Sequence, residues 1–114
     1  MEIRPFEELV EQALAEIPES FRRRMENITI EIEPEQLSFS PDHQLILGIY
    51  QGVPYSYRGP AYQNVLPDKI IIYKKAFDHF DAATLPEMVR NVLQHEIGHY
   101  FGMSEEELAK YKKT

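Results

Sequence analysis

The stretch from Thr84 to Glu105, TLPEMVRNVLQHEIGHYFGMSE, decides the fold, because it predicts an amphipathic helix that carries chemically active side chains. Thr84 is a residue type that caps helices, and Pro86 suits the first helical turn. Apolar residues then recur at three- and four-residue spacing up to Ile97, as on a helix with one face towards a core. Gly102 is a typical left-handed stop after the last turn. We therefore expect one helix that begins at Thr84 and ends just before Gly102.

Within this helix, residues 95–99 read His-Glu-Ile-Gly-His. Histidines four residues apart lie on one helical face, about 6 Å apart along the axis, and can share one metal ion. Glu96 is rotated by about 100° from His95, so its carboxylate can stand beside the ion without binding it. There it can take a proton from water, because zinc lowers the pKa of bound water to roughly 7. The motif predicts His95 and His99 as Zn²⁺ ligands and Glu96 as the catalytic base.

A catalytic zinc site needs a third protein ligand. The chain has no cysteine, so this ligand must be a histidine or a carboxylate. The string from His95 to Glu105 resembles the metzincin signature His-Glu-x-x-His-x-x-Gly-x-x-His, with Glu105 where the third histidine would be. The resemblance implies Glu105 as the third ligand, with Gly102 turning the chain back towards the ion. Glu106 stays open as an alternative, and so does an ordinary helix start in which Ser104 is the N-cap of first-turn acids.

The rest of the chain predicts a small α+β domain. Residues 5–17 have the period of an amphipathic helix, and residues 27–33 alternate as a half-buried strand does. Further strands are predicted over residues 45–50 and 69–73. Between them, residues 51–67 form a long connection rich in tyrosine and proline, which we interpret as a cover of the sheet or a wall of a cleft. We expect a single domain in which a mixed sheet of about three to four strands packs on the two helices.

Composition excludes several classes of protein. The chain has 114 residues and a formal net charge of −7, and most of the excess acid lies in residues 1–35. It lacks the basic stripe that gives most nucleic-acid affinity, and we interpret Arg22, Arg23 and Arg24 as a solvated helix end. The N-terminus has no secretory signal, and no apolar run has the roughly 20 residues of a membrane span. We expect a cytoplasmic protein with no nucleic-acid or membrane partner.

The chain as a whole resembles the small bacterial zincin-like metallopeptidases. The specific part is HEIGHYFGMSEEEL at residues 95–108, and supporting segments are PFEELVEQALAEIPESFR, ITIEIE, LGIYQGVPYSYRG and LPDKIIIYKKAF. The resemblance implies a zincin-like fold, a metal site of two histidines and one acid, and peptidase activity. One departure from the metzincins is plain, because no methionine follows Glu105 to make their Met-turn.

Other candidate residues have simpler interpretations. His43 follows Pro41-Asp42 and is expected in a turn, and His79 is expected at the surface rather than as a substrate contact. Arg58 is expected to support the long connection rather than to bind a substrate carboxylate. One tyrosine could stabilise an oxyanion, and the sequence does not distinguish among Tyr50, Tyr55, Tyr57, Tyr62 and Tyr73.

The favoured function is a zinc-dependent metallopeptidase acting on a peptide or protein substrate. We expect the substrate to add a strand to a sheet edge, with residues 69–73 as the candidate edge. A non-catalytic zinc-binding interaction module is the main alternative, and a zinc hydrolase acting on RNA is a weaker one because the chain is acidic and carries Glu96. The oligomeric state stays open.

Overall fold

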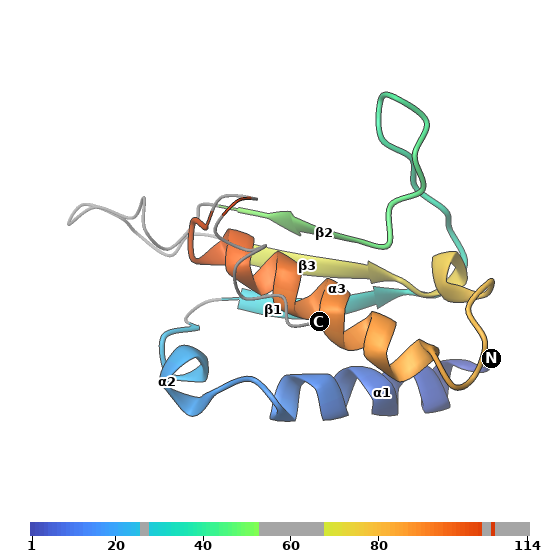
Figure 1. Cartoon of the computed structure of the whole chain (residues 1–114). Coiled ribbons are helices and arrows are strands. Elements are labelled where there is room, and N and C mark those ends of the chain that lie inside the picture. Colours follow the sequence, from blue (N-terminus) through green and yellow to red (C-terminus); the bar gives the residue numbers. More distant parts are fainter. Residues whose placement is uncertain (26–27, 53–67, 104–105, 107–114) are drawn as a thin grey trace.

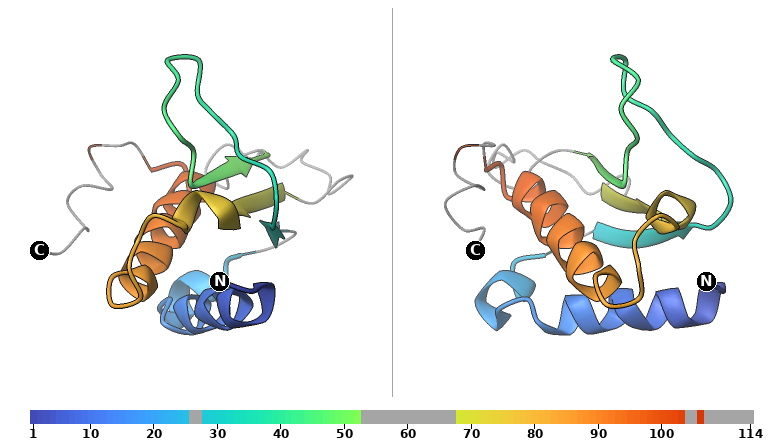
Figure 2. Two further views of the ribbon diagram at one scale, coloured as in Figure 1. Left: turned by 90° about the vertical axis from the view of Figure 1, so that its right-hand side faces the viewer. Right: turned by 45° about the vertical axis from the view of Figure 1, so that its right-hand side comes forward.

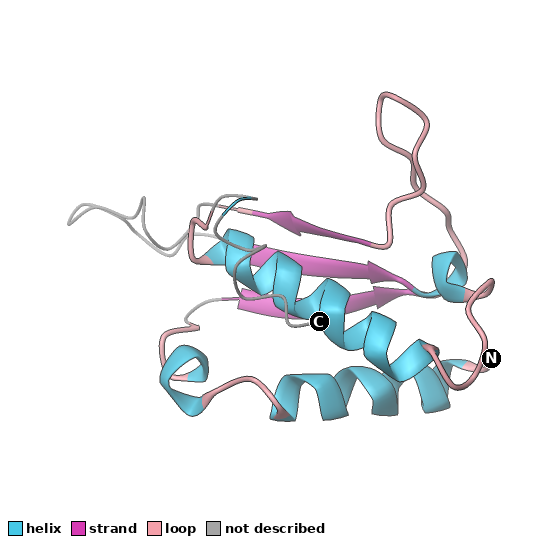
Figure 3. Ribbon diagram, in the orientation of Figure 1, coloured by secondary structure: helices cyan, strands magenta, loops and turns pink. Residues whose placement is uncertain are grey.

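The computed structural model of the chain describes residues 1–25, 28–52, 68–103 and 106. The described elements are, in chain order, α1 (Ile3–Ala15), α2 (Glu19–Arg22), β1 (Ile28–Glu33), β2 (Gly48–Gln51), β3 (Asp68–Tyr73), a 3-10 helix (Lys74–Phe77) and α3 (Leu85–Tyr100). Figures 1 and 3 show a small sheet accompanied by two long helices, which confirms the predicted α+β class. None of the helices in these ranges is long and apolar enough to cross a membrane.

The sheet has the strand order β1-β3-β2, so β3 lies in the middle. β1 pairs with β3 in parallel, with Ile30 opposite Ile70, and β2 pairs with β3 in antiparallel orientation, with Tyr50 opposite Ile70. The expectation that residues 69–73 offer a free edge to a substrate is therefore wrong. Both hydrogen-bonding edges of β3 are already paired, one with β1 and one with β2. The uninterrupted apolar run Ile70–Ile72 is typical of such a central strand.

The second strand begins later than predicted, at Gly48 instead of Leu45. Leu45 instead forms an isolated antiparallel bridge with Phe39, and the Ile46 N–H donates to the Ser38 carbonyl over 2.9 Å. These contacts make a separate hairpin that stands away from the body of the molecule (Figures 1 and 2). Its tip turns at His43, which has a φ of 67°, and the predicted turn position of that histidine is confirmed.

The two long helices cover one face of the sheet (Figure 2). Alternate residues of β3 point towards them, because Ile70 and Ile72 are fully buried while Ile71 is half-buried. The core joins α1, β3, the 3-10 helix and α3, and its buried members are Phe6, Val10, Ala13, Ile17, Ile70, Ile72, Phe77, Leu85, Val89, Leu93 and Ile97. α3 also packs against β2, with the Tyr50 ring beside the ring of Tyr100 at the end of the helix.

The start of α3 departs from expectation in one detail. Thr84 precedes the helix as predicted, but its side chain makes no capping hydrogen bond. Thr84 instead bonds backwards to Asp81, whose Oδ1 atom accepts the Thr84 N–H over 2.8 Å and the Thr84 hydroxyl over 2.6 Å. The hydroxyl bond first, and then the N–H bond, hold the pKa of Asp81 below its usual value. An aspartate three residues upstream thus begins the turn that leads into α3.

The end of α3 confirms the prediction for Gly102, which has a φ of 81°. The Gly102 N–H donates to the His99 carbonyl over 2.9 Å, and the Met103 N–H donates to the Gly98 carbonyl over 3.0 Å. This pair of bonds is the Schellman motif, which satisfies the last helical carbonyls and reverses the chain. Gly102 and Met103 therefore turn away from the helical path.

Candidate metal centre

Two imidazoles meet on one face of α3, near its C-terminal end. The Nε2 atoms of His95 and His99 are 3.1 Å apart. The ring centroids are separated by 4.7 Å, and the ring planes stand at 82° to each other. Both side chains are half-buried. The four-residue spacing therefore brings the two Nε2 atoms close together, as the motif predicts.

This geometry fits a zinc ion. Zinc binds imidazole nitrogen at about 2.0–2.1 Å, so an ion equidistant from two nitrogens 3.1 Å apart would subtend an angle of about 98°. That angle is within roughly ten degrees of the tetrahedral value that zinc prefers. Neutral imidazole is also among the commonest ligands of zinc. The two histidines can thus hold zinc without a rearrangement of the helix.

Glu96 lies next to this pair. Ligand atoms of His95, Glu96 and His99 all lie within 4.8 Å of one another, and the three residues could together hold a metal ion. The carboxylate is half-buried, like the two imidazoles. A carboxylate at this range can reach the same ion, or it can reach a water molecule placed between them.

Aromatic packing holds the end of the motif helix in place. Tyr100 is fully buried directly after His99, and its hydroxyl donates to the Arg24 carbonyl over 3.3 Å. Phe101 packs edge-on against Phe21, with ring centroids 5.4 Å apart. Both contacts tie the turns that carry the site to the segment around α2.

Of the two candidate tyrosines in the described part of the chain, Tyr50 lies close to this helix. Its ring stands edge-on to that of Tyr100 at 6.0 Å. Its hydroxyl donates to Asp68 Oδ2 over 2.6 Å, and Asp68 is a charged residue that is only 4% exposed. The chain passes so near this carboxylate at Gly52 that a Cβ atom there would lie 2.2 Å from its carbon. Sequence reasoning missed Asp68, because an acid before an apolar strand looks like a turn residue.

The edge strand β2 lies close against the motif helix. A Cβ atom at Gly48 would lie 2.9 Å from Val92 Cγ1 and 3.0 Å from Ile72 Cδ1. Only glycine permits this approach without a shift of neighbours, because carbon atoms normally pack at about 3.5–4.0 Å. The strand that borders the site is thus β2, in place of the predicted residues 69–73.

The other candidate residues either lie elsewhere in the fold or fall outside the described part of the chain. His79 is exposed, stacks on Phe80 with centroids 4.1 Å apart, and precedes the N-terminal end of α3, whereas the histidine pair lies near the other end. Tyr73 ends β3, and Glu106 is exposed. Five predicted residues lie outside the described part of the chain, namely Glu105, Arg58, Tyr55, Tyr57 and Tyr62.

Comparisons with known proteins agree with this geometry. The family model described as zincin-like metallopeptidase matches residues 25–114. Among solved structures, the chain is similar to a conserved hypothetical protein from Thermus thermophilus, with 26% sequence identity and a TM-score of 0.62. The similarity covers 95% of this chain and 97% of that one. No curated protein matches the chain.

Proposed function

The chain belongs to the family of zincin-like metallopeptidases, and from this membership we propose that it is a zinc-dependent peptidase. The observation that carries the proposal is the 3.1 Å separation of the Nε2 atoms of His95 and His99, which suits a shared zinc ion. The half-buried position of the pair also favours the proposal, because partial exclusion of water strengthens electrostatic interactions at the site.

We assign the proton transfers to Glu96. Zinc supplies the Lewis acid that polarises a peptide carbonyl and activates water, whose pKa falls to about 7. The Glu96 carboxylate lies within 4.8 Å of the ligand nitrogens, a span that one water molecule can bridge. In our proposal this carboxylate accepts the proton of the attacking water and then gives it to the leaving amine nitrogen.

We propose Glu105 as the third ligand. The Schellman turn at Gly102 supports this assignment, because it reverses the chain three residues before Glu105. A carboxylate completes the two-histidine site in a chain without cysteine. Glu106 is the competing acid. The zinc affinities of Glu105→Ala and Glu106→Ala decide between the two residues.

We propose that the peptide substrate pairs with β2. This strand is at the edge of the sheet and borders α3, so an added strand there would lie beside the histidine pair. Main-chain pairing of this kind gives affinity with little dependence on side chains. The substrate is therefore expected to bind in an extended conformation.

Metal analysis with matched variants tests the proposal. The purified chain should hold one zinc ion, and His95→Ala and His99→Ala should each abolish the bound zinc. Glu105→Ala should weaken zinc binding by at least about tenfold, whereas Glu106→Ala, the matched control, should bind zinc like the wild type. Glu96→Gln should keep zinc and lose peptide hydrolysis by about 10²–10⁴-fold. A wild-type chain without affinity for zinc would refute the proposal.

A non-catalytic zinc-binding module is the second candidate, since the same nitrogen separation also suits a purely structural ion. A structural zinc site is closed by four protein ligands, whereas a catalytic one keeps an open position. X-ray absorption of the zinc-loaded chain distinguishes them by the presence of a water ligand. Peptide hydrolysis at the background rate in both the zinc-loaded wild type and Glu96→Gln would favour this candidate.

A further inference from the structure

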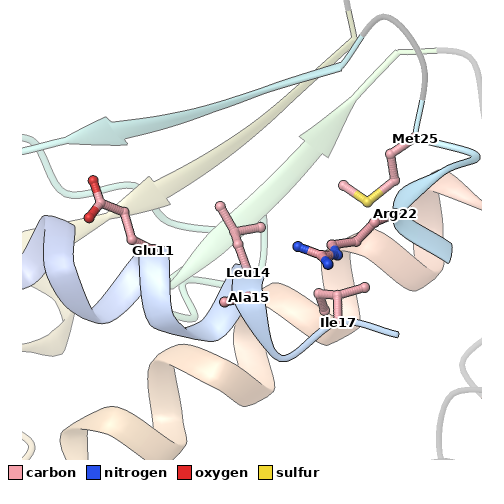
Figure 4. Close-up of a pocket in the computed structure, with 6 residues that line it drawn as sticks. All are labelled: Glu11, Leu14, Ala15, Ile17, Arg22 and Met25. Carbon is pink, nitrogen blue, oxygen red and sulfur yellow. The ribbon is translucent and has the colours of Figure 1, made fainter. Parts of the chain in front are cut away.

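A groove between α1 and α2 carries a separate inference. Its volume is about 390 Å³, and it is lined by Glu11, Leu14, Ala15, Ile17, Arg22 and Met25. Figure 4 shows Glu11 at one end of this lining and Met25 at the other, with the Arg22 guanidinium beside Ile17 and directed towards Leu14. The volume falls within the roughly 300–1,000 Å³ of sites that bind small ligands or side chains. The groove therefore combines an apolar floor with an acid at one end and a base beside Ile17.

The arginines beside the groove are unusual for this acidic chain. Arg22, Arg23 and Arg24 are all exposed, and in the described ranges none of them forms an ion pair. The chain as a whole has a net charge of −7, so a cluster of three exposed arginines is opposite in sign to the molecule as a whole. A carboxylate is attracted to the part of the groove beside Arg22, whereas Glu11 repels it from its own end. The groove thus favours a ligand with acids on one side only.

The groove also lies near the candidate metal centre. The Arg24 carbonyl accepts the hydroxyl of Tyr100, and Phe21 packs on Phe101, so the segment around α2 contacts the residues that follow His99. A partner held in the groove is therefore held beside the end of the motif helix. That position suits a second contact with the same macromolecule that enters the site.

We propose that this groove binds a segment of the protein substrate in which an apolar side chain is followed by acidic residues. The apolar side chain packs on Leu14 and Ala15, and the carboxylates pair with Arg22. The inference rests on the proposed peptidase function for the identity of the partner as a substrate. Through this groove, a small domain can recognise one substrate by a segment that is distant from the bond that is cleaved.

Peptide selection on an inactive chain tests the groove. The full chain with Glu96→Gln is used to select binders from a random peptide display library, and one selected peptide is labelled with fluorescein. Its dissociation constant should rise at least about tenfold with Arg22→Glu, which reverses the charge. It should rise similarly with Ala15→Gln, which fills the groove at an exposed helical position without a change of charge. The matched control Lys75→Glu, on the exposed surface of the 3-10 helix, should change it by less than about twofold.

Three results would overturn the proposal. The first is a library that yields no binder, and the second is a selected peptide that binds Arg22→Glu and Ala15→Gln as it binds the parent chain. The third is displacement of the peptide by single-stranded RNA with no effect of Ala15→Gln, which would assign the arginines to phosphate binding instead. Circular dichroism confirms that each variant is folded. Because binding is measured without turnover, loss of hydrolysis with intact peptide binding would reject only the peptidase, and the converse would reject only the groove.

Discussion

The close contact of β2 with α3 makes Gly48→Ala a sharp test of the packing beside the site. The added methyl would lie 2.9 Å from Val92 Cγ1, 3.0 Å from Ile72 Cδ1 and 3.3 Å from the Ile71 carbonyl oxygen. Against an optimum of about 3.5–4.0 Å, the two carbon contacts are too short by at least about half an ångström. Val92 is β-branched and stiff at χ1, so it cannot easily turn away.

Overpacking of this kind costs about 1–3 kcal/mol, and the usual gain of about 0.5–1 kcal/mol for alanine over glycine in a strand offsets part of it. We therefore expect Gly48→Ala to lower the free energy of unfolding by about 1–2 kcal/mol in urea denaturation. Val92→Ala removes one of the clashing atoms, so the double variant should be more stable than the sum of the single effects predicts. A neutral Gly48→Ala, or strictly additive effects of the two changes, would refute the close approach of β2 to α3.

Three further outcomes follow from particular contacts. Tyr50→Phe removes a hydrogen-bond donor to the buried Asp68 carboxylate, and should lower the free energy of unfolding by about 1–3 kcal/mol in urea denaturation. The control Tyr73→Phe should lower it by less. Leu93→Ala opens the fully buried core under α3, and should cost about 2–5 kcal/mol in the same assay. The pKa of Asp81 is lowered in the folded chain, so its stabilising contribution is complete above the unfolded pKa of about 3.9 and is lost as the pH falls through the folded value. Thermal unfolding should accordingly show that Asp81→Ala destabilises the chain at pH 7, and that the difference from the wild type shrinks at lower pH; a constant difference would contradict the hydrogen bonds assigned to Asp81.

The local features of the site followed from sequence because they depend on residues that are neighbours along the chain. The spacing of His95 and His99 places two imidazoles on one face of any helix, and Gly102 ends that helix because glycine adopts positive φ at little cost. Periodicity likewise located α1, β1 and β3, since each element buries one face. Thr84 was predicted as the cap because its type suits that position, but its hydroxyl donates to Asp81 instead of accepting a helical N–H.

Contacts between distant segments decided the rest. Strand order puts β3 between β1 and β2, which moves the edge beside the site from residues 69–73 to β2. The pairing of Tyr50 with Asp68, 18 residues apart, and the groove between α1 and α2 likewise arise only when separate elements pack. The sequence by itself thus determined the helix, the pairing of His95 with His99 on one of its faces and the α+β class, because these depend on short-range spacing and on a two-residue or 3.6-residue period. The tertiary structure alone decided which strand borders the site and which surface lies next to it, because hydrophobic burial sets the order of strands without leaving a local pattern.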